Sequence, residues 1–383
     1  MVLDQYLKRT WAEVDLDAIA HNYEMIKKAA GNAECMCIVK ADAYGHGAVP
    51  VARQLFDCGA RFFAVSNIEE ALQLRDGGIS GGILILGYTP PELADVLYIN
   101  DISQTVFSLS GAEKLAHAAG SRSIKVHIKL DTGMSRLGLN GSAEEMAAQA
   151  LKICGIKGLR VEGLFTHFAR ADEKNDEATA AQFALFSAVS DALDAAGVKI
   201  RYRHCCNSAG MLAYPEYRLN MCRPGLILYG LSPFGGEYGT PAMTLKTVVS
   251  QIKTVPAGTS ISYGGRFVTK RDSRIAVLPV GYADGFARLL SGKAQVLING
   301  ERVNTVGNVC MDMTMADVTD KNVSEGDTAV IIGAEGGERI TAEDIARLTG
   351  TIPYEVISLI GKRVPRVFIK NGEIVGSTGL LEH

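Results

Sequence analysis

The chain has 383 residues, which is more than one hydrophobic core usually supports, so we expect two domains. Hydrophobic residues make up 47% of the chain and charged residues 21%, which is typical of a soluble globular protein. The formal net charge is −3, there is no basic run, and the longest apolar stretches are only strand-sized. The sequence therefore indicates neither a nucleic-acid partner nor a membrane span.

The N-terminus shows no secretion signal pattern, so we expect the protein to stay in the cytoplasm. Its eight cysteines mostly lie in apolar runs and show neither a CxxC pair nor zinc-ligand spacing. They are predicted to be reduced core residues, and no metal site is expected.

In chain order, Thr10 to Leu16 alternate like a strand, and Asp17 is placed to cap a helix that runs to about Ala30. From Cys35 onward a short apolar run, a loop and an amphipathic segment recur. The expected strands are Cys35–Val39, Phe62–Ser66, Ile83–Leu86, Ile102–Phe107, Val126–Leu130, Val161–Phe165, Tyr202–Cys206 and Leu219–Arg223.

Helices are expected between these strands, although those of the third and eighth repeats are hard to see. Eight such repeats over about 200 residues favour an α/β fold, a (β/α)8 barrel of the TIM type, over an open sheet. The expected helices are Val51–Cys58, Ile68–Arg75, Gly111–Ala119, Ala143–Ile153 and Thr179–Ala196.

After about Gly239 the pattern changes to β-rich runs separated by turn signals, with one clear helix at Thr341–Leu348. We therefore predict a barrel domain over residues 1–240 and a mainly β domain over residues 241–383. The first ten or so residues are expected to pack with the β domain. The expected strands are Thr244–Val255, Ile275–Val280, Ala294–Ile298, Thr314–Val318 and Thr328–Ile332.

Polar side chains follow several of the barrel strands at their C-terminal ends, where barrel enzymes carry their chemistry. Each has an ordinary explanation by itself: a lysine reaching solvent, a structural histidine, a loop salt bridge between Asp131 and Arg136, or a helix cap at Ser208. Their placement on one rim favours a functional site. The residues are Lys40, Lys129, Asp131, Arg136, His167, Asn207, Ser208 and Arg223.

The types of these residues suggest pyridoxal phosphate as a cofactor. Burial at a strand end lowers the pKa of a lysine such as Lys40 and makes its amine a candidate for Schiff-base formation. Small-residue turns offer backbone N–H groups to a phosphate, and an arginine such as Arg223 can face a ring nitrogen.

Nearly the whole chain resembles the alanine racemase family. The lysine string and the tyrosine string of the second domain are specific in combination, because isolated barrels that bind pyridoxal phosphate have the first and lack the second. The matching strings are IVKADAYGHGA around Lys40, KLDTGMSRLGL from Lys129, GLFTHFA around His167, CNSAG at Asn207, RPGLILYG from Arg223, ISYGG at Tyr263, GYADG at Tyr282, NVCMDM around Cys310 and IPYEV at Tyr354.

The resemblance implies a covalent link between Lys40 and the cofactor. Arg223 is implied to meet the pyridine nitrogen, and because a guanidinium only donates, that nitrogen stays unprotonated. The residues implied to surround the cofactor phosphate are Tyr44, Ser208, Gly225, Leu226 and Tyr354.

The resemblance also implies a two-base racemisation of L- and D-alanine, with Lys40 on one face of the substrate and Tyr263 on the other. His167 is implied to hydrogen-bond Tyr263 and so to set its proton affinity. The implied substrate contacts are Arg136 and Met311, and Lys129 matches a position that is carbamylated in the family.

In this family the partner subunit contributes the tyrosine, so the resemblance implies a homodimer with shared sites that supplies D-alanine for peptidoglycan. A racemase of serine or of broad range is the nearest alternative, because an apolar pocket rejects one extra hydroxyl poorly. A decarboxylase on the same plan and a cofactor-binding regulatory protein are others. The decarboxylase lacks a motif here, and a pure binder has no use for Tyr263 as a second base.

Overall fold

The computed structural model describes residues 9–173 and 176–379. The chain divides into two compact units. The barrel unit consists of Ile19–Ala43 and Ala48–Thr240, and the β unit consists of the described residues up to Ala18, of Tyr44–Gly47 and of the described residues from Pro241 onward. Each unit is described by itself.

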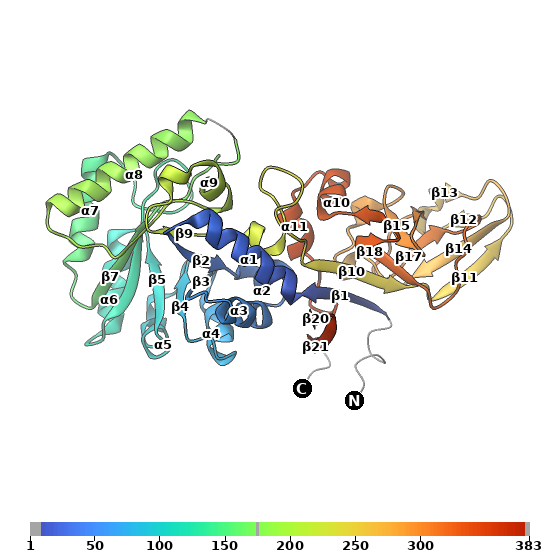
Figure 1. Ribbon diagram of the computed structural model, residues 1–383, viewed down its shortest axis with the longest axis horizontal. Helices are drawn as coiled ribbons and strands as arrows, with labels where there is room; N and C mark the ends of the chain where they lie inside the picture. Colours follow the sequence, from blue (N-terminus) through green and yellow to red (C-terminus); the bar gives the residue numbers. More distant parts are fainter. Residues whose placement is uncertain (1–8, 174–175, 380–383) are drawn as a thin grey trace. The chain divides into compact units, whose positions relative to one another are not determined.

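Eight parallel strands of the described chain form the sheet of the barrel unit, which confirms the predicted barrel-type fold (Figure 1). Neighbours follow chain order from β2 to β8, and β9 returns to pair with β2. The N–H of Arg223 donates to the carbonyl of Cys206 at 2.9 Å, so the segments that follow β9 and β8 are also joined. The strands are β2 Glu34–Ile38, β3 Phe62–Val65, β4 Gly82–Ile85, β5 Ile102–Val106, β6 Ile124–Lys129, β7 Leu159–Phe165, β8 Tyr202–His204 and β9 Met221–Cys222.

Helices cover the outside of this sheet, and several begin at a side chain that caps their free N–H groups (Figure 1). Asn67, Ser108 and Asp176 each accept a backbone N–H of the first helical turn, and Ser142 with Glu145 forms a capping box. The helices are α1 Leu16–Ala30, α3 Ala48–Asp57, α4 Ile68–Asp76, α5 Ala94–Ile99, α6 Leu109–Ala119, α7 Ala143–Cys154, α8 Glu177–Ala195 and α9 Ser208–Ala213.

Three details of the helices differ from the prediction or complete it. The N–H of Ala18 donates to Asp15 at 2.9 Å, so Asp15 and not Asp17 caps α1. The helix of the third repeat is the six-residue α5, and the eighth strand is followed by the short 3-10 helix η4, Leu226–Tyr229. Both are too short to give an amphipathic repeat that a sequence would reveal.

An eleven-stranded sheet within the described residues dominates the β unit, in the order β11-β14-β17-β16-β15-β18-β10-β1-β20-β21 with β19 beside β18. The predicted Asn299-Gly300 turn joins β15 and β16, and both residues have positive φ, as a two-residue hairpin turn requires. The strands are β1 Thr10–Asp15, β10 Met243–Val248, β11 Gln251–Val255, β14 Ser273–Leu278, β15 Gln295–Ile298, β16 Glu301–Val306, β17 Thr314–Asp317, β18 Thr328–Glu335, β19 Glu338–Ile340, β20 Arg366–Lys370 and β21 Glu373–Thr378.

The remaining elements of the β unit are small. Strands β12 Ser260–Ile261 and β13 Phe267–Val268 pair with each other, and the helices are α10 Ala342–Thr349 and α11 Pro353–Ser358. The second of these helices was not predicted, because six residues are too few for a periodic pattern.

Strand β1 lies between β10 and β20, antiparallel to the first and parallel to the second. The expectation that the first ten or so residues pack with the β domain falls mostly on residues 1–8, which lie outside the described part of the chain. The assignment of residues 1–240 and 241–383 to a cofactor-binding and a second-base domain stays a prediction.

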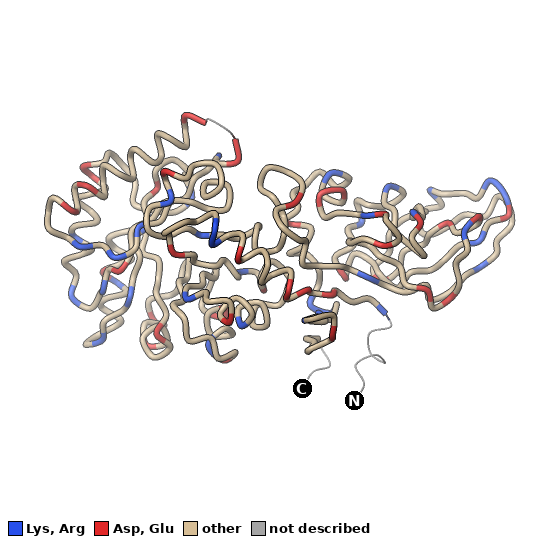
Figure 2. The backbone as a smooth tube through the Cα atoms, in the orientation of Figure 1, with Lys and Arg blue, Asp and Glu red and all other residues tan. Residues whose placement is uncertain are grey.

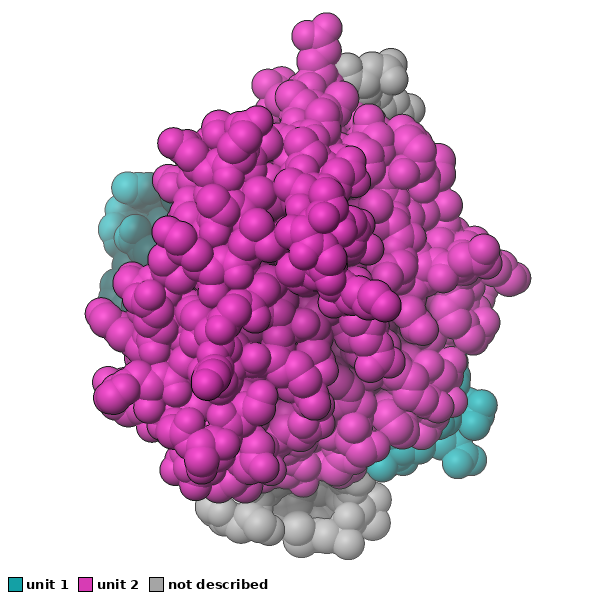
Figure 3. Space-filling view, turned by 90° about the vertical axis from the view of Figure 1, so that its left-hand side faces the viewer, with its two compact units in different colours: residues 1–18, 44–47, 241–383 teal, residues 19–43, 48–240 magenta. Residues whose placement is uncertain are grey.

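Positions of lysine and arginine are interspersed with those of aspartate and glutamate along the backbone of each unit (Figure 2), and the barrel unit forms one rounded body (Figure 3). Within the described residues, no helix combines the length and the apolar character that crossing a membrane requires.

Candidate active site

Lys40 is half-buried directly after β2, at the start of a turn of unusual hand. Residues Ala41 to Tyr44 all have positive φ, between 51° and 54°, so the segment labelled α2, Lys40–Gly45, winds left-handed. L-residues avoid this conformation because Cβ approaches the following carbonyl. The turn therefore needs support from its surroundings.

Two carboxylates supply that support within the barrel unit. Glu70, on α4, accepts the N–H of Ala41 with one oxygen and the N–H of Ser66 with the other, each at 2.7 Å. Asp42 accepts the N–H of Ala48 at 2.7 Å. The hydroxyl of Tyr229 donates to the carbonyl of Ile38 at 2.9 Å, so the strand end before Lys40 is also fixed.

The loop after β6 is closed around Asp131. Its carboxylate accepts the N–H groups of Gly133, Ser135 and Arg136 at 2.9–3.1 Å. Asp131 is therefore a loop organiser, and it contacts Arg136 through the backbone N–H of that residue. Lys129 donates to the carbonyl of Leu137 at 2.7 Å, which places its amine beneath the same loop.

Arg223 is fully buried at the centre of a chain of histidines. Its terminal nitrogens donate to Nδ1 of His204 at 2.9 Å and to Nδ1 of His167 at 3.2 Å, and Nε2 of His204 is 2.9 Å from Nδ1 of His127. Because a guanidinium only donates, His167 and His204 accept at Nδ1 and carry their proton at Nε2. His167 therefore has an N–H left to offer to another group.

These histidines are neutral. Burial and the charge of Arg223 lower the pKa of His127 to about 3 and hold the pKa of His204 well below its usual value. The pKa of His167 is also far below its usual value, through burial and the charges of Arg223, Arg136, Lys129 and Lys40.

Four cationic side chains converge in the barrel unit. Burial and the neighbouring Arg136 lower the pKa of Lys40, with Glu70 opposing. Burial and the charges of Arg223 and Arg136 lower the pKa of Lys129 to about 8, with Asp131 opposing. The repulsion among these four cationic side chains would be relieved by an anionic ligand bound between them.

Two short helical turns begin beside these cations. Asn207 caps α9 by accepting the N–H of Gly210 at 2.9 Å, so Ser208 is not the cap. The hydroxyl of Ser208 instead accepts the N–H of Gly225 at 2.9 Å, immediately before η4 at Leu226. The first N–H groups of a helical turn have no partner inside it and suit a phosphate.

The β unit holds the other four predicted residues. Tyr44 and Tyr354 place their ring centroids 5.9 Å apart, and burial raises the pKa of Tyr44. Gly45, the residue after Tyr44, packs directly against the backbone of α11. A Cβ at this position would lie 2.3 Å from the carbonyl oxygen of Ile357. Only glycine fits this approach, which fixes the distance between the turn and the helix that carries Tyr354.

Tyr263 follows a strained residue and is 73% exposed within this chain. Ser262 has φ 67° and ψ 179°, a region that is otherwise almost confined to glycine. Asn308 donates to the carbonyl of Tyr263 at 2.6 Å, and the Ser262 hydroxyl donates to the carbonyl of Asn308 at 2.7 Å. The tyrosine is therefore exposed but its backbone is clamped. Met311, 52% exposed, lies three residues beyond Asn308.

The predicted residues thus fall into two sets, one in each unit. Lys40, Lys129, Arg136, His167, Ser208, Arg223, Gly225 and Leu226 belong to the barrel unit, and Tyr44, Tyr263, Met311 and Tyr354 belong to the β unit. The sequence analysis assigned no role to Glu70, His127, His204, Tyr229 or Asn308. His204 lies at a strand end, which was the one signal available for it.

The fold and these residues define a class: a barrel enzyme that sets a lysine of lowered pKa among cations that receive an anionic ligand. Comparisons with known proteins identify the family. The family model for alanine racemase, N-terminal domain, matches residues 14–233, and that for alanine racemase, C-terminal domain, matches residues 242–368.

Individual relatives agree. Alanine racemase 1 of Clostridium acetobutylicum is 46% identical over 379 residues, 97% of this chain and 98% of the relative. The crystal structure of alanine racemase from Bacillus anthracis with bound L-Ala-P superposes with a TM-score of 0.92 at 39% identity and 98% coverage of both chains. That of the Bartonella henselae enzyme with covalently bound pyridoxal phosphate gives 0.84 at 29% identity, covering 94% and 99%. The chain belongs to the alanine racemase family and is an isomerase, which confirms the resemblance.

Proposed function

We propose that this isomerase interconverts L- and D-alanine with pyridoxal 5′-phosphate as its cofactor and with Lys40 and Tyr263 as its two bases. The observation that carries the proposal is the convergence of Lys40, Lys129, Arg136 and Arg223, where burial and the charges of the two arginines lower the pKa of the two lysines. A ligand that brings a phosphate and a carboxylate matches such a site.

The residues fit the cofactor. Both terminal nitrogens of Arg223 have acceptors, whereas its Nε–H has none among the described residues and is available to a ring nitrogen. Ser208, Gly225 and Leu226 lie where two helical turns begin, which suits a phosphate. When bound, pyridoxal phosphate supplies an electron-withdrawing ring that makes the Cα proton of an amino acid removable.

The chain's own residues move the proton. Lys40, with its lowered pKa, takes or returns a proton as an amine on one face of the substrate Cα. Tyr263 does so on the other face. A tyrosine has an ordinary pKa near 10 and needs a donor that favours its ionised form, and the Nε2–H of the neutral His167 is such a donor. Arg136 orients the substrate through its carboxylate, with Met311 beside it.

The two-base proposal is tested with Tyr263→Phe in deuterated water. The variant should keep the cofactor absorbance but lose Cα proton exchange at one face, by roughly 10²–10⁴-fold, the usual contribution of a general base. Tyr98→Phe, at a half-exposed tyrosine of α5, is the matched control and should exchange both enantiomers normally.

Two results would contradict parts of this proposal separately. Exchange of both enantiomers by Tyr263→Phe at wild-type rates would remove Tyr263 as a base. A protein that stays colourless with added pyridoxal phosphate, or a Lys40→Ala variant that keeps the borohydride-sensitive absorbance, would remove the cofactor or its attachment site.

We further propose that Lys129 is carbamylated. With a pKa of about 8, part of its amine is neutral near neutral pH and can attack the carbon of CO2, forming an N–C bond and releasing one proton to solvent. The resulting anion would offset the charges of Arg136 and Arg223.

Labelled carbonate and carbon NMR test this modification. A carbamate signal should appear in the wild type, be absent from Lys129→Met, and weaken as the pH falls below about 8, because protonation removes the nucleophile. The Michaelis constant for alanine should rise over the same range. A signal that persists in Lys129→Met would place the carbamate elsewhere.

Assembly and location complete the proposal. The β unit exposes large apolar side chains, among them Tyr263, Met311 and Leu289 at 52–73%, which supports a homodimer whose sites are shared between subunits. All eight cysteines are free thiols, which supports a reducing compartment, the cytoplasm. D-Alanine for peptidoglycan is the expected use, and a deletion strain should then require D-alanine for growth.

A further inference from the structure

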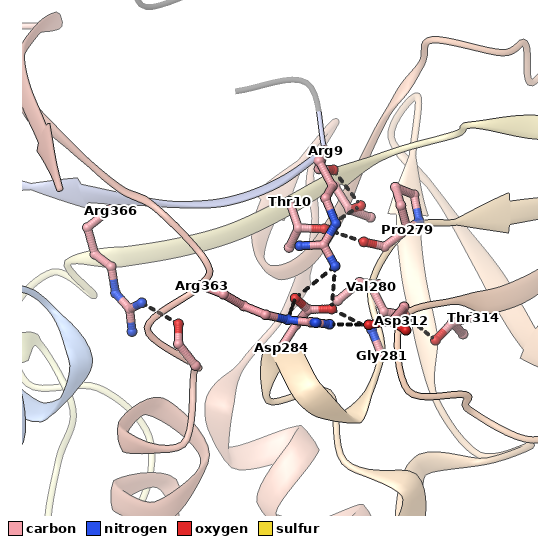
Figure 4. Close-up of polar contacts among 12 residues, drawn as sticks. Arg9, Thr10, Pro279, Val280, Gly281, Asp284, Asp312, Thr314, Arg363 and Arg366 are labelled. Atoms are coloured by element: carbon pink, nitrogen blue, oxygen red, sulfur yellow. Dashed lines mark hydrogen bonds and ion pairs between the residues drawn. The ribbon is translucent and has the colours of Figure 1, made fainter. Parts of the chain in front are cut away.

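A buried carboxylate in the β unit has no part in the proposed chemistry. Asp284, in the 3-10 helix η6 Tyr282–Asp284, has no exposed side-chain surface and accepts the N–H of Gly281 at 2.9 Å. Two guanidinium groups meet it, Arg9 at 3.0 Å and Arg363 at 2.7 Å (Figure 4). Such a buried charge is stable only because it is paired on several sides.

The turn that Asp284 closes holds the backbone next to Met311. The N–H of Tyr282 donates to the carbonyl of Cys310 at 3.0 Å, and the N–H of Ala283 donates to the carbonyl of Met311 at 3.1 Å. A Cβ on Gly281 would lie 2.3–2.4 Å from those two oxygens, so the approach requires glycine. The backbone carbonyl groups of Cys310 and Met311 are therefore held in place by this turn.

Arg363 adds a second connection that Arg9 does not make. While Nε of Arg363 binds Asp284, its Nη2 donates to Asp312 at 2.7 Å, and Asp312 is the residue directly after Met311 (Figure 4). The side chain of Asp312 is half-exposed. Arg363 thus joins a buried anchor to the exposed loop of a proposed substrate contact.

The loop that carries Arg363 is itself held. Arg366, buried, donates to the carbonyls of Ile360 and Gly361 at 2.6 Å and of Val364 at 2.7 Å. The N–H of Gly361 donates to the carbonyl of Asp284 at 3.0 Å. Arg363 therefore projects from a fixed backbone.

We propose that Arg363 is a positioning residue for the substrate site. By bridging Asp284 and Asp312 it holds Met311 in the place from which Met311 contacts the substrate. The inference rests on the proposed role of Met311. An ion pair to a half-exposed aspartate contributes little to overall stability, so its effect belongs to the geometry of the loop.

The test compares Arg363→Met with Arg9→Met in the full-length, cofactor-loaded protein. Both variants remove one guanidinium from Asp284 and should lower the melting temperature to a similar extent. Only Arg363→Met should also raise the Michaelis constant for alanine, on the order of tenfold, because it alone frees the Met311 loop. The cofactor absorbance should not change in either variant.

Asp312→Asn approaches the same connection from its other end. This isosteric change should raise the Michaelis constant in the same direction while leaving the melting temperature near the wild-type value. Combining it with Arg363→Met should add nothing further, because both changes break one bridge.

A readout independent of catalysis separates this inference from the proposed function. Amide hydrogen exchange over residues 309–313 should accelerate in Arg363→Met and not in Arg9→Met. Equal exchange in the two variants, or an unchanged Michaelis constant in Asp312→Asn, would overturn the bridge. A wild-type chain that does not racemise alanine would overturn the proposed function, and the exchange data would still decide whether the bridge orders the loop.

Discussion

Lys40 is presented by four residues that all adopt a conformation L-amino acids avoid. At about 1–2 kcal/mol each, residues Ala41 to Tyr44 would cost several kcal/mol if nothing opposed the strain. One carboxylate oxygen of Glu70 accepts the first N–H of the turn, that of Ala41. The other oxygen accepts the N–H of Ser66, the residue directly after β3. The position of the lysine amine therefore depends on a glutamate that does not touch it.

Glu70→Ala should expose this dependence. Loss of two hydrogen bonds to a charged acceptor should lower the free energy of unfolding by about 3 kcal/mol, and cofactor attachment at Lys40 should weaken. Because Glu70 raises the pKa of Lys40, its removal should also shift the acid limb of the activity profile to lower pH. Urea unfolding, cofactor titration and the pH profile measure these effects.

A second substitution distinguishes turn support from general damage. Ala41→Gly in the Glu70→Ala background should recover part of the loss, because glycine adopts positive φ without strain. Glu69→Ala, at the exposed neighbour on the same helix, is the control and should change none of these quantities. If Glu69→Ala and Glu70→Ala behave alike, or if glycine restores nothing, the supporting role is wrong.

At the scale of residues, the sequence identified groups whose type and place at a strand end indicate chemistry, such as Lys40, His167 and Arg223. It could not distinguish Glu70 from Glu69, since both read as polar positions of one amphipathic helix. It also assigned no role to Asn308, whose partner is the backbone carbonyl of Tyr263 across 45 residues of sequence. Such partnerships become visible only when the fold brings the backbone together.

Elements buried on both faces were predicted closely. Strands β3 and β4 are continuous apolar runs, and the structure places the barrel strands within a few residues of the predicted bounds. Several strands of the β unit were not predicted, among them β16 inside its sheet and β21 at its edge. β16 buries only three of its six residues and β21 buries none, so neither shows a clear apolar period.

The left-handed conformation of α2 could not be predicted from the periodicity of apolar residues. Its residues Ala41, Asp42, Ala43 and Tyr44 have no preference for positive φ that would announce a left-handed turn, and an aspartate alone is common in ordinary turns. Tertiary contacts impose this conformation. The family resemblance indicated the motif around Lys40 without indicating the hand of its turn.

For the whole molecule, the proposed shared sites make a prediction about mixtures. Lys40→Ala and Tyr263→Phe chains should each be inactive alone. If each site takes its lysine from one subunit and its tyrosine from the other, a mixed dimer has one site with both defects and one intact site. Mixing the two variants under conditions of subunit exchange should therefore restore up to about a quarter of the wild-type activity, because half of the dimers are mixed and each has one working site.

Mixtures of wild-type chains with the double variant Lys40→Ala/Tyr263→Phe are the matched control. Their mixed dimers have one defect in each site and should contribute no activity. Failure of the two single variants to complement each other, with subunit exchange verified by mass, would show that each chain completes its own site.

Strand β1 has a consequence for synthesis. Thr10 bonds Thr247, 237 residues away, and Asp17 accepts the N–H of Asn371, 354 residues away. At about 5–20 residues per second, the ribosome needs roughly 10–50 seconds to deliver β10 after β1 has been made. Throughout that time β1 has one largely buried-type face and two unpaired edges, and it must avoid pairing with other strands until β10 and then β20 flank it.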